Sequence, residues 1–183
     1  DMKYKIAIDI DDTLLDTKEL KDFYWNIFLQ ENSHINLRKE LKIEEFWDKY
    51  REKIAFGKVK IGASKCLDNL IEKDCVIDLL SARPLEKYNC LKKQIVKYFE
   101  DNNLHYNYMY LGFASKIDFL KEHNYNLLID NDLEHIEQAN KVGINTILFA
   151  ESINFDYSGN QASNWKEVNI LVEKLLENRK QEK

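Results

Sequence analysis

The chain has 183 residues, of which 44% are hydrophobic and 32% charged, with a formal net charge of -5, and this is enough for one main domain with a small insertion. The acidic balance excludes the strongly basic surface that binds a nucleic acid polymer, and the three cysteines lack the C-x-x-C spacing of a zinc site. Because no run approaches the roughly 18 uninterrupted apolar residues of a membrane helix, we expect a cytoplasmic protein without a membrane partner.

Short apolar runs that end in turns recur along the chain and predict the strands of a parallel sheet. They lie at 4–9, 75–81, 126–130 and 145–150, with a weaker candidate at 107–112. Helical periodicity follows these runs and predicts helices at 62–73, 84–102, 116–124, 132–142 and 165–178. Because nearly continuous apolar strands alternate with helices, we expect a Rossmann-like three-layer α/β/α fold, with a parallel sheet covered on both faces.

A long insertion follows the first predicted strand, and its periodicity predicts two amphipathic helices at 19–30 and 38–56. The insertion is rich in aromatic residues, namely Phe23, Tyr24, Trp25, Phe28, Phe46, Trp47, Tyr50 and Phe56. Aromatic residues at helical spacing usually form a small core, and they can also stack on a nucleobase. We therefore expect a core domain of residues 1–15 and 60–183 and a helical cap of residues 16–59.

Four aspartates follow the first strand in the stretch KIAIDIDDTLLDT at 5–17. One interpretation is an acidic turn in which Asp12 or Thr13 caps a helix. A calcium loop is excluded, because its sixth and twelfth positions require Gly and Glu where this chain has leucines. The third interpretation is chemical, because α/β sheets bind ligands at the carboxyl ends of their strands and clustered carboxylates need a cation. Mg²⁺ and an aspartate nucleophile together suit phosphoryl transfer.

The pattern D-x-D-x-T, formed by Asp9, Asp11 and Thr13, resembles motif one of the haloacid dehalogenase (HAD) superfamily, whose members are mostly phosphatases. The other three motifs of that superfamily have counterparts in the expected order. These are Ser81 in VIDLLSARP, Lys116 in FASKIDFL and Asp130 in NLLIDNDLEHI. A cap after motif one, the SARP form of motif two and NWKEV before the last helix are similar to the deoxyribonucleotidase branch and its bacterial nucleotidases.

The resemblance implies a catalytic role for two of the aspartates. Asp9 would attack phosphorus and form an aspartyl-phosphate, while Asp11 would protonate the leaving oxygen and then activate water, for which its pKa must lie near neutral in the closed site. The implied cofactor is Mg²⁺, held by the Asp9 carboxylate, the Asp11 carbonyl and Asp130.

Around motif four the sequence departs from the usual pattern. A shift of the alignment by one residue would make Asn131 the direct metal ligand in place of Asp130. The second metal partner stays open among Asn131, Asp132 and Glu134.

The resemblance also implies a set of phosphate-binding residues. It comprises Asp12 through its backbone amide, Thr13, Ser81 and Lys116, while Arg83 either contacts phosphate or supports a loop. The histidines at 34, 105, 123 and 135 lack the spacing of metal ligands, and we expect them at the surface or at helix ends.

Three functions remain open from the sequence. The first is a magnesium-dependent nucleotidase that hydrolyses nucleoside monophosphates, with cap aromatics that could stack on the base. The second is a phosphatase with the same machinery and another small substrate, such as a sugar phosphate. The third is a catalytically silent binding or regulatory protein on the same fold.

Overall fold

The computed structural model describes residues 2–33 and 38–182, without side-chain detail for residues 39–41. The strands are β1 (Lys5–Ile8), β2 (Val76–Ser81), β3 (Tyr108–Leu111), β4 (Leu127–Asp130), β5 (Asn145–Phe149) and β6 (Gln161–Ala162). The helices are α1 (Thr17–Glu31), α2 (Lys39–Ile54), α3 (Ala63–Glu72), α4 (Leu85–Tyr88), α5 (Lys92–Asp101), α6 (Ile117–Glu122), α7 (Leu133–Lys141) and α8 (Trp165–Gln181), with a 3-10 turn at Asn89–Leu91. None of the helices in this part of the chain is both long and apolar enough to cross a membrane.

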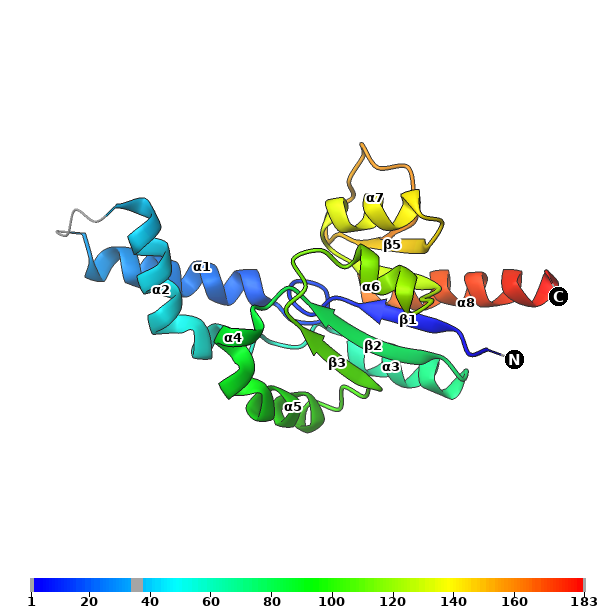
Figure 1. Cartoon of the computed structure of the whole chain (residues 1–183), viewed down its shortest axis with the longest axis horizontal. Coiled ribbons are helices and arrows are strands. Elements are labelled where there is room, and N and C mark those ends of the chain that lie inside the picture. The colour runs from blue at the N-terminus through cyan, green and yellow to red at the C-terminus, as the bar shows by residue number, and fades with distance from the viewer. Residues whose placement is uncertain (1, 34–37, 183) are drawn as a thin grey trace.

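The strands form one parallel sheet in the order β3-β2-β1-β4-β5-β6. Strand β1 lies inside the sheet, where Ile8 pairs with Leu79 of β2 and with Ile129 of β4. The chain builds the sheet outward from β1 in one direction and then in the other, so its winding reverses beside β1. Such a reversal opens a ligand-binding crevice at the carboxyl ends of the strands. The predicted Rossmann-like α/β/α fold with helices inserted after the first strand is confirmed (Figure 1).

Alternate residues of each strand pack against helices on opposite faces of the sheet. On β1, Ile6 and Ile8 belong to the larger core, which includes buried residues of α3, α5 and α8. Ala7, between them, belongs to the smaller core with residues of α6 and α7. Because both faces are covered, the strands read as nearly continuous apolar runs in the sequence.

The prediction of one continuous helix at 84–102 is wrong for the middle of this segment. Helix α4 ends at Tyr88, the 3-10 turn follows, and α5 begins at Lys92. Tyr88, Asn89 and Cys90 all have low helix propensity, and the tighter turn places both Tyr88 and Leu91 in buried positions. Strand β6 was not predicted, because two residues are too few to show an alternating pattern.

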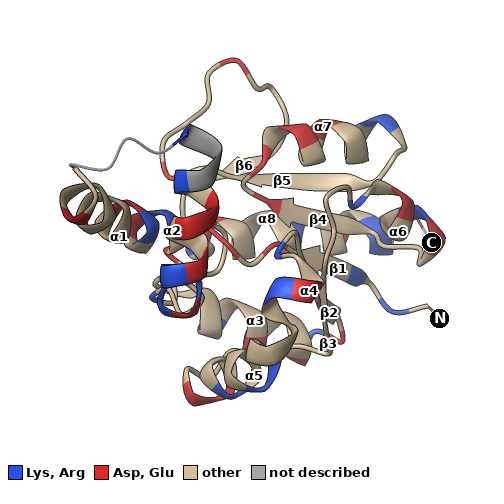
Figure 2. Cartoon of the chain, turned by 60° about the vertical axis from the view of Figure 1, so that its left-hand side comes forward, with Lys and Arg blue, Asp and Glu red and all other residues tan. Residues whose placement is uncertain are grey.

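Helices α1 and α2, which we call the cap, extend from the sheet on the side away from both termini (Figure 1). Their contact is aromatic: Phe28 and Phe46 are buried between them, and the ring of Tyr24 stacks on Tyr50 with centroids 5.0 Å apart. Phe23 differs, since 58% of it is exposed. Acidic and basic residues lie side by side along α2 (Figure 2). Most of the cap aromatics therefore form a small core of their own.

Two linkers of opposite direction join the cap to the sheet. The amide of Asp16 donates to the carbonyl of Lys58, and the amide of Lys60 donates to the carbonyl of Leu14, both at 2.8 Å. The linkers approach so closely that a Cβ at Gly57 would lie 3.1 Å from the Asp16 carbonyl. These paired linkers fix where the cap begins, directly above the loop that follows β1.

Candidate active site

The loop after β1 turns sharply at the carboxyl edge of the sheet. The carbonyl of Ile10 accepts the amides of Leu14 at 2.9 Å and Leu15 at 3.1 Å. Asp12 has a φ of 61°, in the left-handed region that Asp adopts more readily than most residues. Its amide donates to the carbonyl of Leu15 at 2.8 Å. In this conformation the Asp12 amide closes the turn, and its expected phosphate contact stays a prediction.

Thr13 and Trp165 support this loop from beneath. Both residues are fully buried, and the Trp165 indole N–H donates to the Thr13 carbonyl at 2.9 Å. The Thr13 hydroxyl donates to Asp9 Oδ2 at 3.3 Å. In this conformation the Thr13 hydroxyl contacts the Asp9 carboxylate, and its expected phosphate contact stays a prediction.

Asp9, Lys116 and Asp130, which the sequence proposed as site residues, come together in one buried ion-pair cluster. The Lys116 ammonium donates to Asp9 Oδ1 and to Asp130 Oδ2, both at 2.7 Å. The side chains are 1% exposed for Lys116, 11% for Asp9 and 1% for Asp130. Asp9 follows β1, Asp130 ends the neighbouring β4, and Lys116 immediately precedes α6. A single ammonium thus faces two buried carboxylates.

This imbalance of charge decides how the cluster is protonated. Burial, together with the charge of Asp130, raises the pKa of Asp9 to about 7, although Lys116 opposes this. Burial lowers the pKa of Lys116, but the charges of Asp9 and Asp130 outweigh burial and raise it overall. Lys116 therefore stays a cation, and Asp9 is the group that an additional cation would help to keep ionised.

His135 is a member of this site that the sequence did not suggest. Its Nδ1 lies 3.2 Å from Asp130 Oδ2, and its Nε2 lies 3.4 Å from the Ala114 carbonyl. Burial alone would raise the pKa of Asp130, but the hydrogen bonds from His135 and Lys116 hold it below its ordinary value. His135 lies in the first turn of α7, in agreement with the expected helix-end position, and it also contacts Asp130, while His34 lies outside the described residues. The five-residue spacing from Asp130 across a helix start was the available signal.

Asp11 is held by an arginine that the sequence left with two possible roles. Arg83 Nε donates to Asp11 Oδ2 at 2.9 Å and Nη2 donates to Oδ1 at 2.8 Å, while the Thr17 hydroxyl donates to Oδ1 at 2.5 Å. Burial raises the pKa of Asp11, but the hydrogen bonds and charge of Arg83 outweigh it, so the pKa is lowered. This lowered pKa belongs to the substrate-free conformation, and the near-neutral pKa expected for Asp11 in the closed site stays a prediction. Ser81, fully buried, accepts the Arg83 amide at 3.1 Å.

The oxygen atoms that converge near Asp9 indicate which residues are placed to hold a metal ion. Both oxygens of Asp130 are occupied, Oδ1 by the amide of Asp132 at 2.9 Å and Oδ2 by Lys116 and His135. In this metal-free conformation the Asp130 oxygens are engaged in hydrogen bonds, and its role as a direct ligand stays a prediction. The terminal amide group of Asn131 instead reaches within 2.9 Å of Asp9 Oδ2 and 3.2 Å of the Asp11 carbonyl.

Carboxylate, carbonyl and carboxamide oxygens are the ligands that Mg²⁺ and Ca²⁺ take in proteins. With its amide oxygen turned toward Asp9, Asn131 would complete such a set, so these residues fit a hard divalent cation. Within the described ranges, no three His, Cys, Asp or Glu side chains converge as a metal site, which is compatible with a set that includes a backbone carbonyl and an amide. Asp132 and Glu134 are exposed and form the cap of α7, where the Asp132 carboxylate accepts the Glu134 amide.

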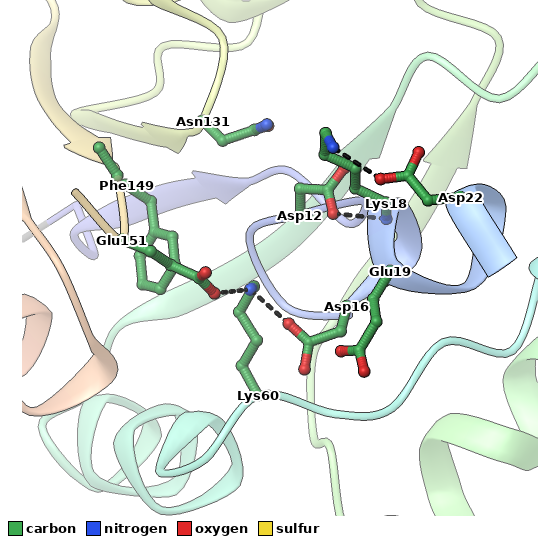
Figure 3. A pocket seen from close by; sticks show the side chains of 10 residues that line it. Asp12, Asp16, Lys18, Glu19, Asp22, Lys60, Asn131, Phe149 and Glu151 are labelled. Carbon is green, nitrogen blue, oxygen red and sulfur yellow. Dashed lines mark hydrogen bonds and ion pairs between the residues drawn. The ribbon is translucent and has the colours of Figure 1, made fainter.

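A pocket of about 460 Å³ opens beside Asn131, between the start of α1 and the end of β5 (Figure 3). Its lining holds two lysines and five carboxylates, the latter from Asp12, Asp16, Glu19, Asp22 and Glu151. Both lysines are already paired: Lys18 with Asp22 at 2.7 Å, and the buried Lys60 with Asp16 at 2.6 Å and with Glu151. The pocket therefore has an acidic character next to the cluster around Asp9.

The parallel sheet, the helices inserted after β1 and the Asp-Lys-Asp cluster together give a Rossmann-like α/β/α fold with a charged site at the carboxyl edge of the sheet. No family model and no curated protein matches the sequence. Solved structures do match. YfnB of Bacillus subtilis, described as a HAD hydrolase bound to magnesium, has a TM-score of 0.67 at 13% identity over 93% of this chain and 99% of its own.

Two further solved structures have a similar fold. A haloacid dehalogenase-like hydrolase of Streptococcus pneumoniae has a TM-score of 0.70 at 13% identity, covering 93% of this chain and 98% of its own. A protein of Clostridium acetobutylicum described as a predicted phosphatase has a TM-score of 0.66 at 15% identity, covering 97% and 100%. At this level of identity, the comparisons establish the HAD fold.

Proposed function

We propose that this chain is a magnesium-dependent phosphomonoester hydrolase that acts through an aspartyl-phosphate on Asp9. The observation that carries the proposal is the buried contact of Lys116 with Asp9 and Asp130, because it places one cation beside a carboxylate at the ligand-binding edge of the sheet. A phosphoryl group at Asp9 would add negative charge, which Lys116 is positioned to balance. The HAD fold of the solved neighbours supports the same chemistry.

In the proposed reaction, an oxygen of Asp9 forms a bond to phosphorus while the bond from phosphorus to the leaving oxygen breaks. Asp11, once it has taken up a proton from solvent in the substrate-bound site, gives that proton to the leaving oxygen, and then takes a proton from the water that attacks the aspartyl-phosphate. The second step releases inorganic phosphate and restores the Asp9 carboxylate. The Ser81 hydroxyl and the Lys116 ammonium are the proposed phosphate-binding groups.

The metal site that we propose consists of Asp9, the Asp11 carbonyl and Asn131. A bound Mg²⁺ would supply charge neutralisation between the Asp9 carboxylate and the phosphoryl oxygens. Asn131 is included because its amide lies at Asp9 Oδ2 and the Asp11 carbonyl, whereas the Asp130 oxygens are taken by Lys116, His135 and a backbone amide.

Calorimetric titration of the substrate-free protein with Mg²⁺ tests this ligand set. Because added carboxylate charge tightens a site for a hard cation, we expect Asn131→Asp to bind Mg²⁺ about tenfold more tightly, and Asn131→Ala about tenfold more weakly. The matched control is Asp132→Asn, at the next position, which keeps the helix cap and should bind as the wild type does. Wild-type affinity in Asn131→Ala would show that Asn131 is not a ligand.

For the substrate, we propose a nucleoside monophosphate. The five carboxylates of the pocket beside Asn131 disfavour a leaving group that carries further phosphates, which supports monophosphates over di- and triphosphates. Phe23 remains exposed on α1, adjacent to the pocket residue Asp22, and is available for stacking on a base. A sugar phosphate is the second candidate, because the other cap aromatics pack on one another.

A panel of phosphomonoesters, each with Mg²⁺ or with EDTA, tests these proposals. We expect magnesium-dependent release of phosphate from p-nitrophenyl phosphate, faster release from nucleoside monophosphates, and slow release from nucleoside triphosphates. Preference for sugar phosphates over every nucleotide would contradict the nucleotidase and retain the phosphatase. No release from any compound would favour a silent binding protein on the same fold.

A further inference from the structure

The guanidinium of Arg83 occupies an unusual position between the predicted acid and the cap. It makes a bidentate contact with Asp11 at 2.8 and 2.9 Å, and its Nη2 also donates to the carbonyl of Ala55 at 2.9 Å. Ala55 is the residue that ends α2. Arg83 thus connects the loop after β2, the loop after β1 and the end of the cap.

Arg83 also has hydrogen-bond donors that are not used. Its side chain is only 4% exposed, and Nη1 has no partner among the residues that the structure describes. A buried charged donor without an acceptor is costly, so its persistence indicates a group that takes a partner only when ligand is bound. The aromatic ring of Tyr88 lies beside Arg83, with 5.2 Å between the guanidinium carbon and the ring centroid.

The unused donors lie on the loop that is expected to meet phosphate. The Arg83 amide donates to the Ser81 hydroxyl at 3.1 Å, and Ser81 ends β2, the strand beside β1. A phosphoryl group between Asp9 and Ser81 would therefore approach both the guanidinium of Arg83 and the carboxylate of Asp11. These two anions, phosphoryl group and Asp11, would compete for one planar set of N–H donors.

We propose that Arg83 changes partner during the reaction: it holds Asp11 when no substrate is bound, and transfers its N–H donors to the phosphoryl group when substrate arrives. The transfer releases the Asp11 carboxyl, which then contacts the leaving oxygen. This inference rests on the proposed phosphatase function, and it adds that the free enzyme keeps its acid out of use. Thr17 remains beside Asp11 as a hydrogen-bond donor after the exchange.

Binding of inorganic phosphate in the presence of Mg²⁺, measured by calorimetry, tests the transfer. Arg83→Met should weaken phosphate binding about 10- to 100-fold, which is the contribution of hydrogen bonds to a charged group. The phosphate affinity of Arg83→Lys should lie between that of the wild type and that of Arg83→Met. The matched control is Arg51→Met, because the Arg51 guanidinium carbon lies 5.9 Å from the same Tyr88 ring. We expect this control to bind phosphate within about twofold of the wild type, which corresponds to about 0.4 kcal/mol.

A second measurement follows the partner of Arg83 directly. The Nε–H signal of Arg83 in ¹⁵N-arginine NMR spectra, identified by its loss in Arg83→Lys, should shift on addition of phosphate and saturate with the same affinity. An unchanged signal, or equal phosphate affinity of wild type and a folded Arg83→Met, would overturn the inference and leave Arg83 as a static support. If the wild type neither binds phosphate nor hydrolyses any phosphomonoester, the proposed function itself has failed.

Discussion

Asp9→Asn is expected to lower magnesium-dependent hydrolysis of p-nitrophenyl phosphate by at least about 10⁴-fold, because the amide cannot form the aspartyl-phosphate. The fold should be retained, since Asn has a similar volume and can still accept a hydrogen bond from Lys116. The measurement is the initial rate at saturating substrate, with circular dichroism to verify the fold. Substantial activity in the variant would show that Asp9 is not the nucleophile.

The same variant has an expected effect of pH on stability. The pKa of Asp9 is raised from 3.8 to about 7 in the folded state, so the folded protein binds this proton more tightly than the unfolded chain does. Wild-type stability from this group is therefore lost as the pH rises from about 4 to about 7. In denaturant titrations with EDTA, Asp9→Asn should gain stability over the wild type between pH 4 and pH 8. Lower stability of Asp9→Asn than of the wild type in this pH range would contradict the raised pKa of Asp9.

Lys116→Met is expected to lower the free energy of unfolding by about 3–5 kcal/mol, the usual result of removing one partner from a buried ion pair. The ammonium is almost completely buried against Asp9 and Asp130, and without it two carboxylates face each other with His135 as the remaining cation nearby. Hydrolysis should also be lost, because nothing would balance the charge of the phosphoryl group. Urea unfolding in the absence of Mg²⁺ gives the free energy.

A double variant separates the two effects of Lys116. Lys116→Met combined with Asp130→Asn removes one of the competing carboxylates, so it should recover a large part of the lost stability while remaining inactive. If the single variant were as stable as the wild type, the buried contacts of Lys116 would contribute far less than their geometry indicates. If the double variant were no more stable than Lys116→Met, repulsion between the carboxylates would not be the cause.

The strands and the order of the site residues could be predicted because their signals are local. An apolar run such as residues 75–81 is a strand wherever it lies in the sheet, and Ser81 at its end needs only the parallel arrangement to reach the same edge as Asp9. The positions of Asp9, Lys116 and Asp130 followed from motif order, and the structure brings their side chains into direct contact.

The contacts that could not be predicted depend on side-chain direction and on tertiary competition. Nothing in the sequence chooses whether Arg83 reaches outward to a ligand or back to Asp11, 72 positions away. The same holds for His135, whose ring turns toward Asp130 because α7 begins directly beside β4. Asp11 is an example, because the arginine that lowers its pKa in this conformation is distant in the sequence and its contact could not be foreseen.

The hydrogen bond from Trp165 to the carbonyl of Thr13 spans 152 positions of the chain. The loop with Asp9 is therefore synthesised well before Trp165, and it receives this buried support only when residue 165 has emerged from the ribosome. A nascent chain that stops short of that residue would leave the Thr13 carbonyl without its partner and the loop unsupported. The buried support of this loop is thus coupled to the synthesis of α8, which begins with Trp165.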